Sequence, residues 1–418
     1  MAERTTSRNI HPDKETQPKE KWGRDTKWAQ LWKAASKCLK LHIPFAVCHI
    51  PGDENLKFFC GEVNLSNSTL CSANQDDNKL PQNCDAFIIG QWLTPWRERI
   101  SINAAISYAT IADDSFVANV AHHNLSLQSA HSFSSSQVIS KEEYLRAVSK
   151  IINNCKSRNG KTVYSRIIPG ENPKLDITSA ARKLFNFFYD SFGFLYFTPI
   201  TGCWLGASPE TLLDFNTDTR LVSTMAFAGT RSASTGNAPW DEKNMHENLF
   251  VAEYIQEQFR SLDIEPKISS PYTVDYGSIQ HLRRDISAYL PESIDFPELL
   301  DKLNPTPALC GTPLHEAVAD INQFELHKRE CYGGFVGVYQ TQLPETSDIR
   351  EGKETEQQRS FRSFVNLRSA RISTDAAHNF EIIAGGGIIA DSNPQSEWAE
   401  TEAKASRIKA ILSSATDD

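Results

Sequence analysis

Apolar residues along this chain follow two patterns, one typical of helices and one typical of strands. Between Trp28 and Leu39 they recur every three or four residues, which predicts a helix. Two short apolar runs, 43–50 and 86–92, predict extended strands. The polar stretch 66–82 between these runs predicts a loop.

The clearest single element starts at Ser140. Ser140 followed by Glu143 is the capping-box pattern, in which two side chains satisfy backbone N–H groups at the start of a helix. An apolar stripe then runs to Cys155, and Asn159-Gly160 is a typical helix end. The β-branched segment 162–168 predicts a strand directly after this helix.

The remaining elements are predicted from the same two patterns. Helices are expected at 180–192 and from about Trp240 and Pro394, and short strands at 194–198, 203–207, 211–215 and 221–224. Closely spaced strands joined by turns are typical of an α+β fold with large antiparallel sheets. The acidic stretch 341–360 has no apolar periodicity and predicts a surface loop.

Polar and Ser-rich stretches divide the chain into three parts. Residues 1–24 are polar and charged and predict a disordered tail. The Ser-rich stretch 132–136 predicts a connector between a first part, 25–135, and a denser part, 136–418.

Composition excludes several classes of protein. The 418 residues carry a net charge of −9, so a protein that binds nucleic acid through its phosphates is not expected. No run approaches the ~20 apolar residues that span a membrane, and the N-terminus lacks a signal-peptide core. Nine scattered cysteines without a CxxC pair predict reduced structural thiols and a cytoplasmic location.

Two acids lie on the apolar faces of predicted helices. Glu247 shares a face with Val251, and Glu400 shares one with Ile408. One interpretation places each acid at the solvent rim of its face, with Glu400 paired to Lys404 at i+4. The other is a hard, oxygen-ligated cation such as Mg²⁺, because an unpaired acid on an apolar face is costly.

Lys161 and Glu210 are candidates for proton transfer. Lys161 begins a strand that is expected to be buried, and desolvation makes a lysine a competent base. Glu210 lies at a strand end, after a proline turn, where catalytic groups are common. Taken alone, each residue also fits an ordinary place at the surface.

These residues belong to a series of short motifs. The series is Lys161-Thr-Val-Tyr-Ser-Arg166, Gly206-Ala-Ser-Pro-Glu210, Ala228-Gly-Thr-Arg231, His246-Glu247, Pro305-Thr-Pro-Ala-Leu-Cys-Gly311, Tyr332-Gly-Gly334, Leu367-Arg-Ser369, Ala384-Gly-Gly-Gly387 and Glu397-Trp-Ala-Glu-Thr-Glu-Ala-Lys404. In this order, from about residue 140 to 413, the chain resembles the chorismate-utilising enzymes, and among them the isochorismate synthases. The part 25–135 matches only loosely, as expected for that family's variable N-terminal part.

The resemblance implies a fold, a cofactor and a set of roles. The fold would be a sandwich of large antiparallel sheets with helices outside, and 136–418 would be the chorismate-binding catalytic region. Lys161 would be the base that activates water, and Glu210 the acid that protonates the departing hydroxyl. Mg²⁺ would be held by Glu247 and Glu400. The implied substrate-binding residues are Gly229, Thr230, His281, Ala308, Leu309, Tyr332, Arg368, Gly385, Gly386, Gly387 and Lys404.

Two positions favour water as the nucleophile within that family. Similar aminodeoxychorismate synthases have a nucleophilic lysine where this chain has Ala228, and anthranilate synthases usually have glutamine where it has Lys161. The resemblance therefore implies an isomerase that converts chorismate to isochorismate, by addition of water at C2 and loss of the C4 hydroxyl. The alternative is salicylate synthase, which then eliminates pyruvate, although Ala308 stands where such members usually have threonine.

Several alternatives stay open at the level of sequence. A catalytically inactive binding protein is the second alternative, opposed by a competent residue at every proposed position. The residues do not distinguish menaquinone from siderophore biosynthesis as the destination of the product. No glutaminase subunit is expected, and a monomer or a weak homodimer is.

Overall fold

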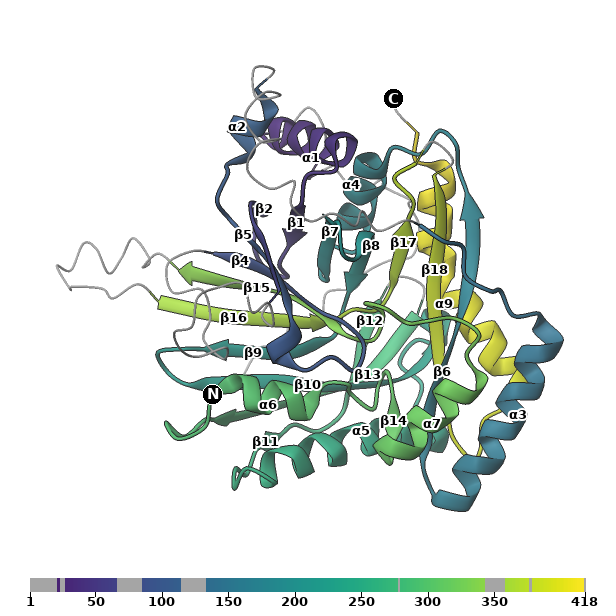
Figure 1. Cartoon of the computed structure of the whole chain (residues 1–418). Coiled ribbons are helices and arrows are strands. Elements are labelled where there is room, and N and C mark those ends of the chain that lie inside the picture. The colour runs from purple at the N-terminus through teal and green to yellow at the C-terminus, as the bar shows by residue number, and fades with distance from the viewer. Residues whose placement is uncertain are drawn as a thin grey trace, which may run out of the picture.

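Two antiparallel sheets with helices around them form the centre of the molecule (Figure 1). The computed structural model describes residues 21–22, 27–65, 85–113, 133–276, 279–342, 358–375 and 378–416. The predicted α+β fold with large antiparallel sheets is confirmed.

Among the described residues, the first sheet has eight strands. Their order across the sheet is β14 (Gly311–Thr312), β6 (Lys161–Glu171), β18 (Asn379–Ile388), β17 (Ser369–Ile372), β8 (Gly202–Ser208), β7 (Phe192–Thr198), β1 (Phe45–His49) and β2 (Leu56–Cys60). Its longest pairing runs between β6 and β18, which places Gly385–Gly387 opposite Val163–Ser165.

The second sheet has ten strands within the part of the chain that the structure describes. Nine follow the order β11 (Lys267–Ile268), β13 (Ile279–Tyr289), β10 (Leu221–Ser232), β9 (Thr211–Asn216), β16 (Gln358–Val365), β15 (Phe335–Gln342), β4 (Ala86–Gly90), β5 (Ile100–Asn103) and β3 (Val63–Leu65). The tenth strand, β12 (Tyr272–Tyr276), pairs with β13 on the side away from β10.

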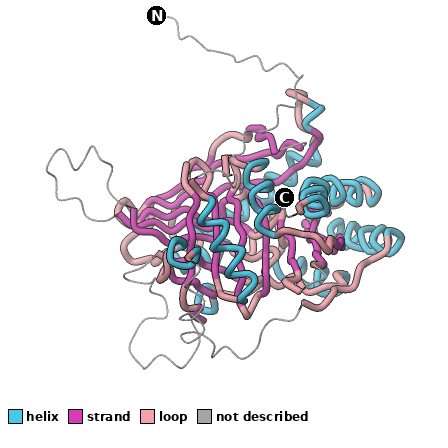
Figure 2. The backbone as a smooth tube through the Cα atoms, turned by 90° about the horizontal axis from the view of Figure 1, so that it is seen from above, coloured by secondary structure: helices cyan, strands magenta, loops and turns pink. Residues whose placement is uncertain are grey.

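Helices cover these sheets; in Figure 2 some of them lie in front of the strands and others lie at the right-hand side. Those described are α1 (Ala29–Leu41), α2 (Tyr108–Ala112), α3 (Lys141–Arg158), α4 (Ile177–Phe187), α5 (Glu242–Arg260), α6 (Phe296–Leu303), α7 (Leu314–Phe324) and α9 (Pro394–Ser414). Helices α3, α4 and α9 pack on the first sheet, and α5 packs along β10 and β13 of the second. No described helix has the length and apolar character needed to cross a membrane.

Aromatic side chains from the two sheets meet in the interior. Phe192 of β7 stacks on Phe364 of β16 with ring centroids 4.2 Å apart, and Tyr196 of β7 lies 5.5 Å from Phe87 of β4. All four side chains are 5% exposed or less. Offset and tilted ring pairs of this kind stabilise a core beyond the area they bury.

The helix predicted from Ser140 is confirmed in detail. The Ser140 hydroxyl accepts a hydrogen bond from the Glu143 N–H, and a Glu143 carboxylate oxygen accepts one from the Ser140 N–H at 3.1 Å. Asn159 ends the helix in the left-handed region, at φ 49°.

Two predicted boundaries are wrong. The helix expected at 180–192 is α4, which starts earlier because Asp176 accepts hydrogen bonds from the backbone of Thr178 and Ser179. It ends at Phe187, and Phe192 already belongs to β7. The strand expected at 221–224 continues to Ser232, because β13 pairs with it along nearly its whole length.

The structure describes only some residues of the tail, the loops and the connector that composition predicts. Residues 1–20, 23–26 and 66–84 and most of the predicted loop 341–360 lie outside the described residues. Trp22, within the predicted tail, is fully buried, and its carbonyl accepts a hydrogen bond from the Trp32 indole at 2.9 Å. The connector is also packed, because the Ser136 hydroxyl donates to Glu381 at 2.8 Å. The seven described cysteines are buried and free, as expected.

Candidate active site

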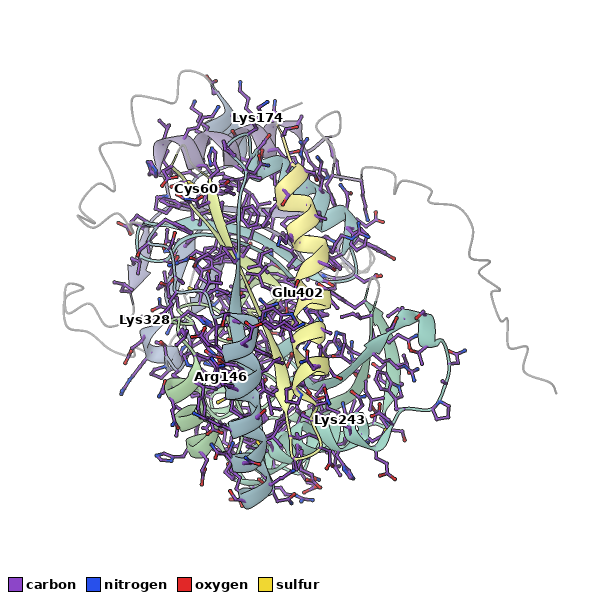
Figure 3. All side chains as sticks on the ribbon, turned by 90° about the vertical axis from the view of Figure 1, so that its right-hand side faces the viewer. Cys60, Arg146, Lys174, Lys243, Lys328 and Glu402 are labelled. Carbon is purple, nitrogen blue, oxygen red and sulfur yellow. The ribbon has the colours of Figure 1, made fainter. Side chains whose placement is uncertain are left out.

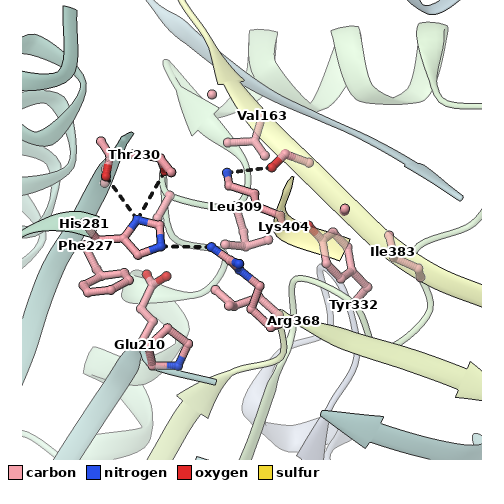
Figure 4. Close-up of a pocket in the computed structure, with 18 of the residues that line it drawn as sticks. Val163, Glu210, Phe227, Thr230, His281, Leu309, Tyr332, Arg368, Ile383 and Lys404 are labelled. Atoms are coloured by element: carbon pink, nitrogen blue, oxygen red, sulfur yellow. Dashed lines mark hydrogen bonds between the residues drawn. The ribbon is translucent and has the colours of Figure 1, made fainter. Parts of the chain in front are cut away.

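A small cavity lies where β6 and β18 of the first sheet face β10, β13 and α5 (Figure 4). It encloses about 60 Å³. Of the predicted site residues, Glu210, Gly229, Thr230, Glu247, His281, Ala308, Leu309, Tyr332, Arg368, Gly385, Gly387 and Lys404 line it. Lys161, Glu400 and Gly386 do not line it but lie next to residues that do. The fold thus collects residues spread over about 240 positions of sequence.

The glycines of β18 allow charged side chains to approach the strand closely. A Cβ atom on Gly387 would lie 2.3 Å from Glu247 Oε1 and 2.6 Å from Lys161 Cε. A Cβ atom on Gly386 would lie 2.9 Å from Glu397 Oε2. Real side chains do not approach this closely, so the glycines make room for a cluster of carboxylates against the strand.

Three glutamates in this cluster each pair with one lysine. Lys161 Nζ lies 3.0 Å from Glu247 Oε1 and Lys243 Nζ lies 2.9 Å from Glu397 Oε1, while Lys404 Nζ lies 2.6 Å from Glu400 Oε1. Figure 3 places Lys243 beside the first half of α9, the helix that carries Glu397 and Glu400.

The charges in the cluster act on one another. Burial lowers the pKa of Lys243, but Glu397, Glu247 and Glu400 together raise it above its usual value. Burial and then the Glu400 charge raise the pKa of Glu397 to about 7. Burial also works to raise the pKa of Glu400, but Lys404 and Lys243 hold it below the usual value. The three acids therefore share one electrostatic environment.

Glu210 lies in a different environment. It sits in the tight turn between β8 and β9 and is only 2% exposed. Burial raises the pKa of its carboxyl to about 8, against the lowering effects of Lys161, a hydrogen bond from Thr306 and Lys404. A carboxyl with this pKa holds a proton at neutral pH and can donate it.

His281 orients the guanidinium of Arg368. Arg368 donates a hydrogen bond to His281 Nε2 at 2.9 Å, and His281 Nδ1 lies 3.1 Å from the Gly229 carbonyl (Figure 4). Because arginine only donates, Nε2 accepts and the ring proton belongs on Nδ1. Burial, then the charges of Arg368 and Lys404, lower the pKa of His281 well below its usual value, so the ring is neutral.

The edge of β18 beside Arg368 is open to a ligand. Strand β17 pairs with β18 only as far as Ile383, opposite Ser369, so Gly385–Gly387 extend past the end of β17. Lys404 donates a hydrogen bond to the Gly385 carbonyl at 2.9 Å. Tyr332 lies on the same cavity, and burial raises the pKa of its hydroxyl to about 12, so the hydroxyl is a donor at neutral pH.

The sequence interpretation missed Glu397 and Lys243. Both have a simple signal in the sequence: Glu397 precedes Glu400 by three residues, and Lys243 precedes Glu247 by four, so each pair shares a helix face. It also missed Arg329, a 3% exposed guanidinium that donates to the carbonyls of Leu309 and Val163 at 2.6 and 2.8 Å. Arg329 holds two walls of the cavity in place.

The carboxylate cluster suits a hard cation in its chemistry. Glu397 Oε2 is buried without a hydrogen-bond partner, and it lies where a Cβ on Gly386 would otherwise be. Carboxylate oxygens are the ligands that Mg²⁺ prefers. As the side chains stand, no three acidic, imidazole or thiol groups among the described residues are close enough to hold a metal. The acids would have to turn from their lysines toward a cation.

Comparison with known proteins identifies relatives of this chain. The isochorismate synthase MenF of Haemophilus influenzae is 30% identical over 218 residues, which are 50% of this chain and 46% of that protein. MenF of Escherichia coli is 31% identical over 222 residues, 50% of this chain and 45% of that protein. The chain thus spans about half the length of the curated relatives it matches.

The fold and the family follow from two further matches. The solved structure of MenF, the menaquinone-specific isochorismate synthase from Escherichia coli, aligns with 93% of this chain and 92% of its own, at a TM-score of 0.66 and 20% identity. The sequence model of the family described as chorismate binding enzyme matches residues 98–413. The chain belongs to this family of chorismate-binding enzymes.

Proposed function

We propose that the protein is an isochorismate synthase that adds water to C2 of chorismate and removes the C4 hydroxyl. The observation that carries the proposal is a pair of buried proton-transfer groups, Lys161 at 0% exposure and Glu210 with its pKa raised to about 8. One reaction needs a base for the incoming water and an acid for the departing hydroxyl, and environment separates the two roles. Relatives at about 30% identity are isochorismate synthases, which supports the same reaction.

Two proton transfers accompany the reaction, and before the next turnover Lys161 loses its proton and Glu210 regains one by exchange with solvent. Lys161 in its neutral form takes a proton from water as the new C2–O bond forms. Glu210 gives its proton to the C4 oxygen as the C4–O bond breaks, and the ring double bonds shift between the two carbons. Water is consumed and released, so the substrate is isomerised.

The dicarboxylate substrate would be held at two places. Arg368, Tyr332 and the open edge of β18 offer donors to one carboxylate. Glu247, Glu397 and Glu400 would hold Mg²⁺, which when bound supplies positive charge next to the second carboxylate. A cation bound there would also compete with Lys161 for Glu247, the lysine's present ion-pair partner.

Of two apolar positions, the first supports water rather than an amine as the nucleophile, and the second supports isochorismate rather than salicylate as the final product. Ala228 lines the cavity and is 6% exposed, so it offers no side-chain amine next to the ring. Ala308 also lines the cavity and provides no hydroxyl.

The test is product analysis. Purified protein is incubated with chorismate and Mg²⁺, and the products are separated by chromatography. Isochorismate as the main product supports the proposal. Salicylate with an equal amount of pyruvate would assign the protein to the salicylate synthases, and no turnover would favour an inactive binding protein.

A further inference from the structure

A second cavity touches the candidate active site from the side of α9. It encloses about 250 Å³ and is lined by Phe187, Phe188, Tyr276, Ile279, Arg368, Ala403, Lys404, Ser406, Arg407 and Ala410. Arg368 and Lys404 line both cavities. These two side chains therefore border both the outer cavity and the inner one.

The inner cavity by itself is too small for the proposed substrate. Ligand pockets typically enclose about 300 Å³ or more, whereas the inner cavity encloses about 60 Å³. Movement of Arg368 or Lys404 would join it to the outer cavity. Both are long side chains: Arg368 makes one hydrogen bond, to His281, and lies over the Tyr276 ring, and Lys404 makes one hydrogen bond, to Gly385, and one ion pair, with Glu400.

A third cation stands at the outer cavity. Arg407 follows Lys404 by one helical turn on α9, is exposed, and lies over the Phe187 ring with its guanidinium carbon 3.9 Å from the ring centroid. Among the described residues no carboxylate pairs with it, in contrast to Arg166 and Lys404 on or against the same helix. Arg407, Lys404 and Arg368 thus form a series of positive charges leading inward.

The outer cavity is also lined by aromatic rings, and Arg368 lies over one of them, with its guanidinium carbon 5.1 Å from the Tyr276 ring centroid. Phe188 and Tyr276 stack with ring centroids 4.5 Å apart and planes 11° from parallel. A passage lined by both positive charges and flat aromatic rings suits a small dianion built on an unsaturated ring.

We propose that the outer cavity is the route by which the dicarboxylate substrate reaches the active site, and that Arg407 guides it there. This inference rests on the proposed function, because it takes its substrate from it. Arg407 attracts the dianion at the entrance and does not touch the reacting atoms, so it affects capture of substrate and not the chemical step.

The first test reverses the charge at the entrance. Arg407→Glu is compared with Lys409→Glu, an exposed residue of the same helix that lies outside the outer cavity. Both variants change net charge equally. At about 0.01 M ionic strength, where the Debye length is ~30 Å, we expect Arg407→Glu to lower kcat/KM by about 3- to 10-fold with kcat unchanged. The effect should nearly vanish at about 1 M salt, and Arg407→Lys should retain wild-type values.

The second test blocks the passage. Ala403→Trp fills the outer cavity, and Ser413→Trp places the same side chain elsewhere on α9. We expect Ala403→Trp alone to lower kcat/KM at every salt concentration. Circular dichroism and thermal unfolding check that these exposed helix positions tolerate the changes.

The outcomes separate the route from the function. An active wild type whose Arg407→Glu and Lys409→Glu variants behave alike at low salt, with Ala403→Trp fully active, overturns the route and leaves the function standing. A wild type without turnover of chorismate overturns the function and, with it, the route.

Discussion

The two ends of the candidate active site handle charge in opposite ways. At Gly386 and Gly387, the buried carboxylates of Glu247 and Glu397 and the half-buried carboxylate of Glu400 are each matched by a lysine. At the other end, the Arg368 guanidinium donates a hydrogen bond to the neutral ring of His281 and pairs with no carboxylate among the described residues. A buried charge without a partner is costly. The carboxylates at the first end are therefore paired with lysines, which a metal cation could replace. The guanidinium at the second end is available to pair with a carboxylate of the substrate.

Lys404 connects the two ends. Its ammonium group pairs with Glu400 in the acidic cluster and donates to the Gly385 carbonyl at the open edge of β18. A cation that took Glu400, or an anion that approached Arg368, would compete for the same lysine. We therefore expect binding at the two ends to be coupled through Lys404.

The largest effect should come from breaking the acidic end. Glu247→Gln, Glu397→Gln or Glu400→Gln removes one charged oxygen ligand and should abolish Mg²⁺-dependent turnover. Calorimetric titration with Mg²⁺ should show the loss of binding directly. Glu402→Gln is the control, because Glu402 on the same helix faces Arg166 and its side chain is 50% exposed (Figure 3). Normal activity of the three variants at limiting Mg²⁺ would show that these acids form ion pairs with lysines but do not bind the metal.

The next effect concerns the proton-transfer pair between the two ends. Lys161→Ala and Glu210→Ala should each lose about 10²- to 10⁴-fold in kcat, the usual contribution of a positioned acid or base. The affinity for chorismate should change little, because neither residue belongs to the Arg368 end. Steady-state kinetics with both variants measure this, and Lys161→Ala is also assayed with ammonium salts at high pH, where an amino product is expected. Weaker affinity with unchanged turnover would make either residue a binding group.

Breaking the anion end should act on affinity instead. Arg368→Gln removes a guanidinium whose charge-assisted hydrogen bonds to a carboxylate contribute about 1.5–3 kcal/mol, so KM for chorismate should rise about 10- to 100-fold. The value of kcat should fall much less. Arg368→Lys keeps the charge without the two-pronged geometry and should lie between wild type and Arg368→Gln. A fall in kcat without a change in KM would contradict this division of the site.

Many elements and residues of the two ends of the site were predictable from sequence, but their arrangement in space was not. Local patterns located α3, α5 and α9 because caps and apolar stripes are properties of neighbouring residues. The full length of β10 was not predictable, since β13, which pairs with it, lies about 55 residues further along the chain.

The same limit applies to the site. The motifs predicted residues at both ends of the site. They did not predict Glu397 and Lys243, because these two residues join the acidic cluster only through the close approach of α9 and α5 to the glycines of β18. The pKa of Glu210 likewise depends on burial by segments distant in sequence. The acidic cluster and the raised pKa of Glu210 both depend on contacts between segments far apart in the chain, and these contacts cannot be predicted from a single sequence.

A change of stability with pH isolates Glu210 without the use of substrate. Its pKa is about 8 in the folded protein and has the usual value near 4.5 in the unfolded chain, so between these values the folded state holds a proton that the unfolded state has lost. Stability should therefore fall as pH rises through this window, by about 1.4 kcal/mol per pH unit, and level off above pH 8. Urea unfolding of metal-free wild type and Glu210→Gln measures the difference between them, and this difference should carry that slope. Glu210→Asp keeps a titratable carboxyl in the same turn and should retain the slope. Parallel pH profiles for wild type and Glu210→Gln would mean that Glu210 is already ionised at neutral pH, and the acid of the reaction would then have to be another group.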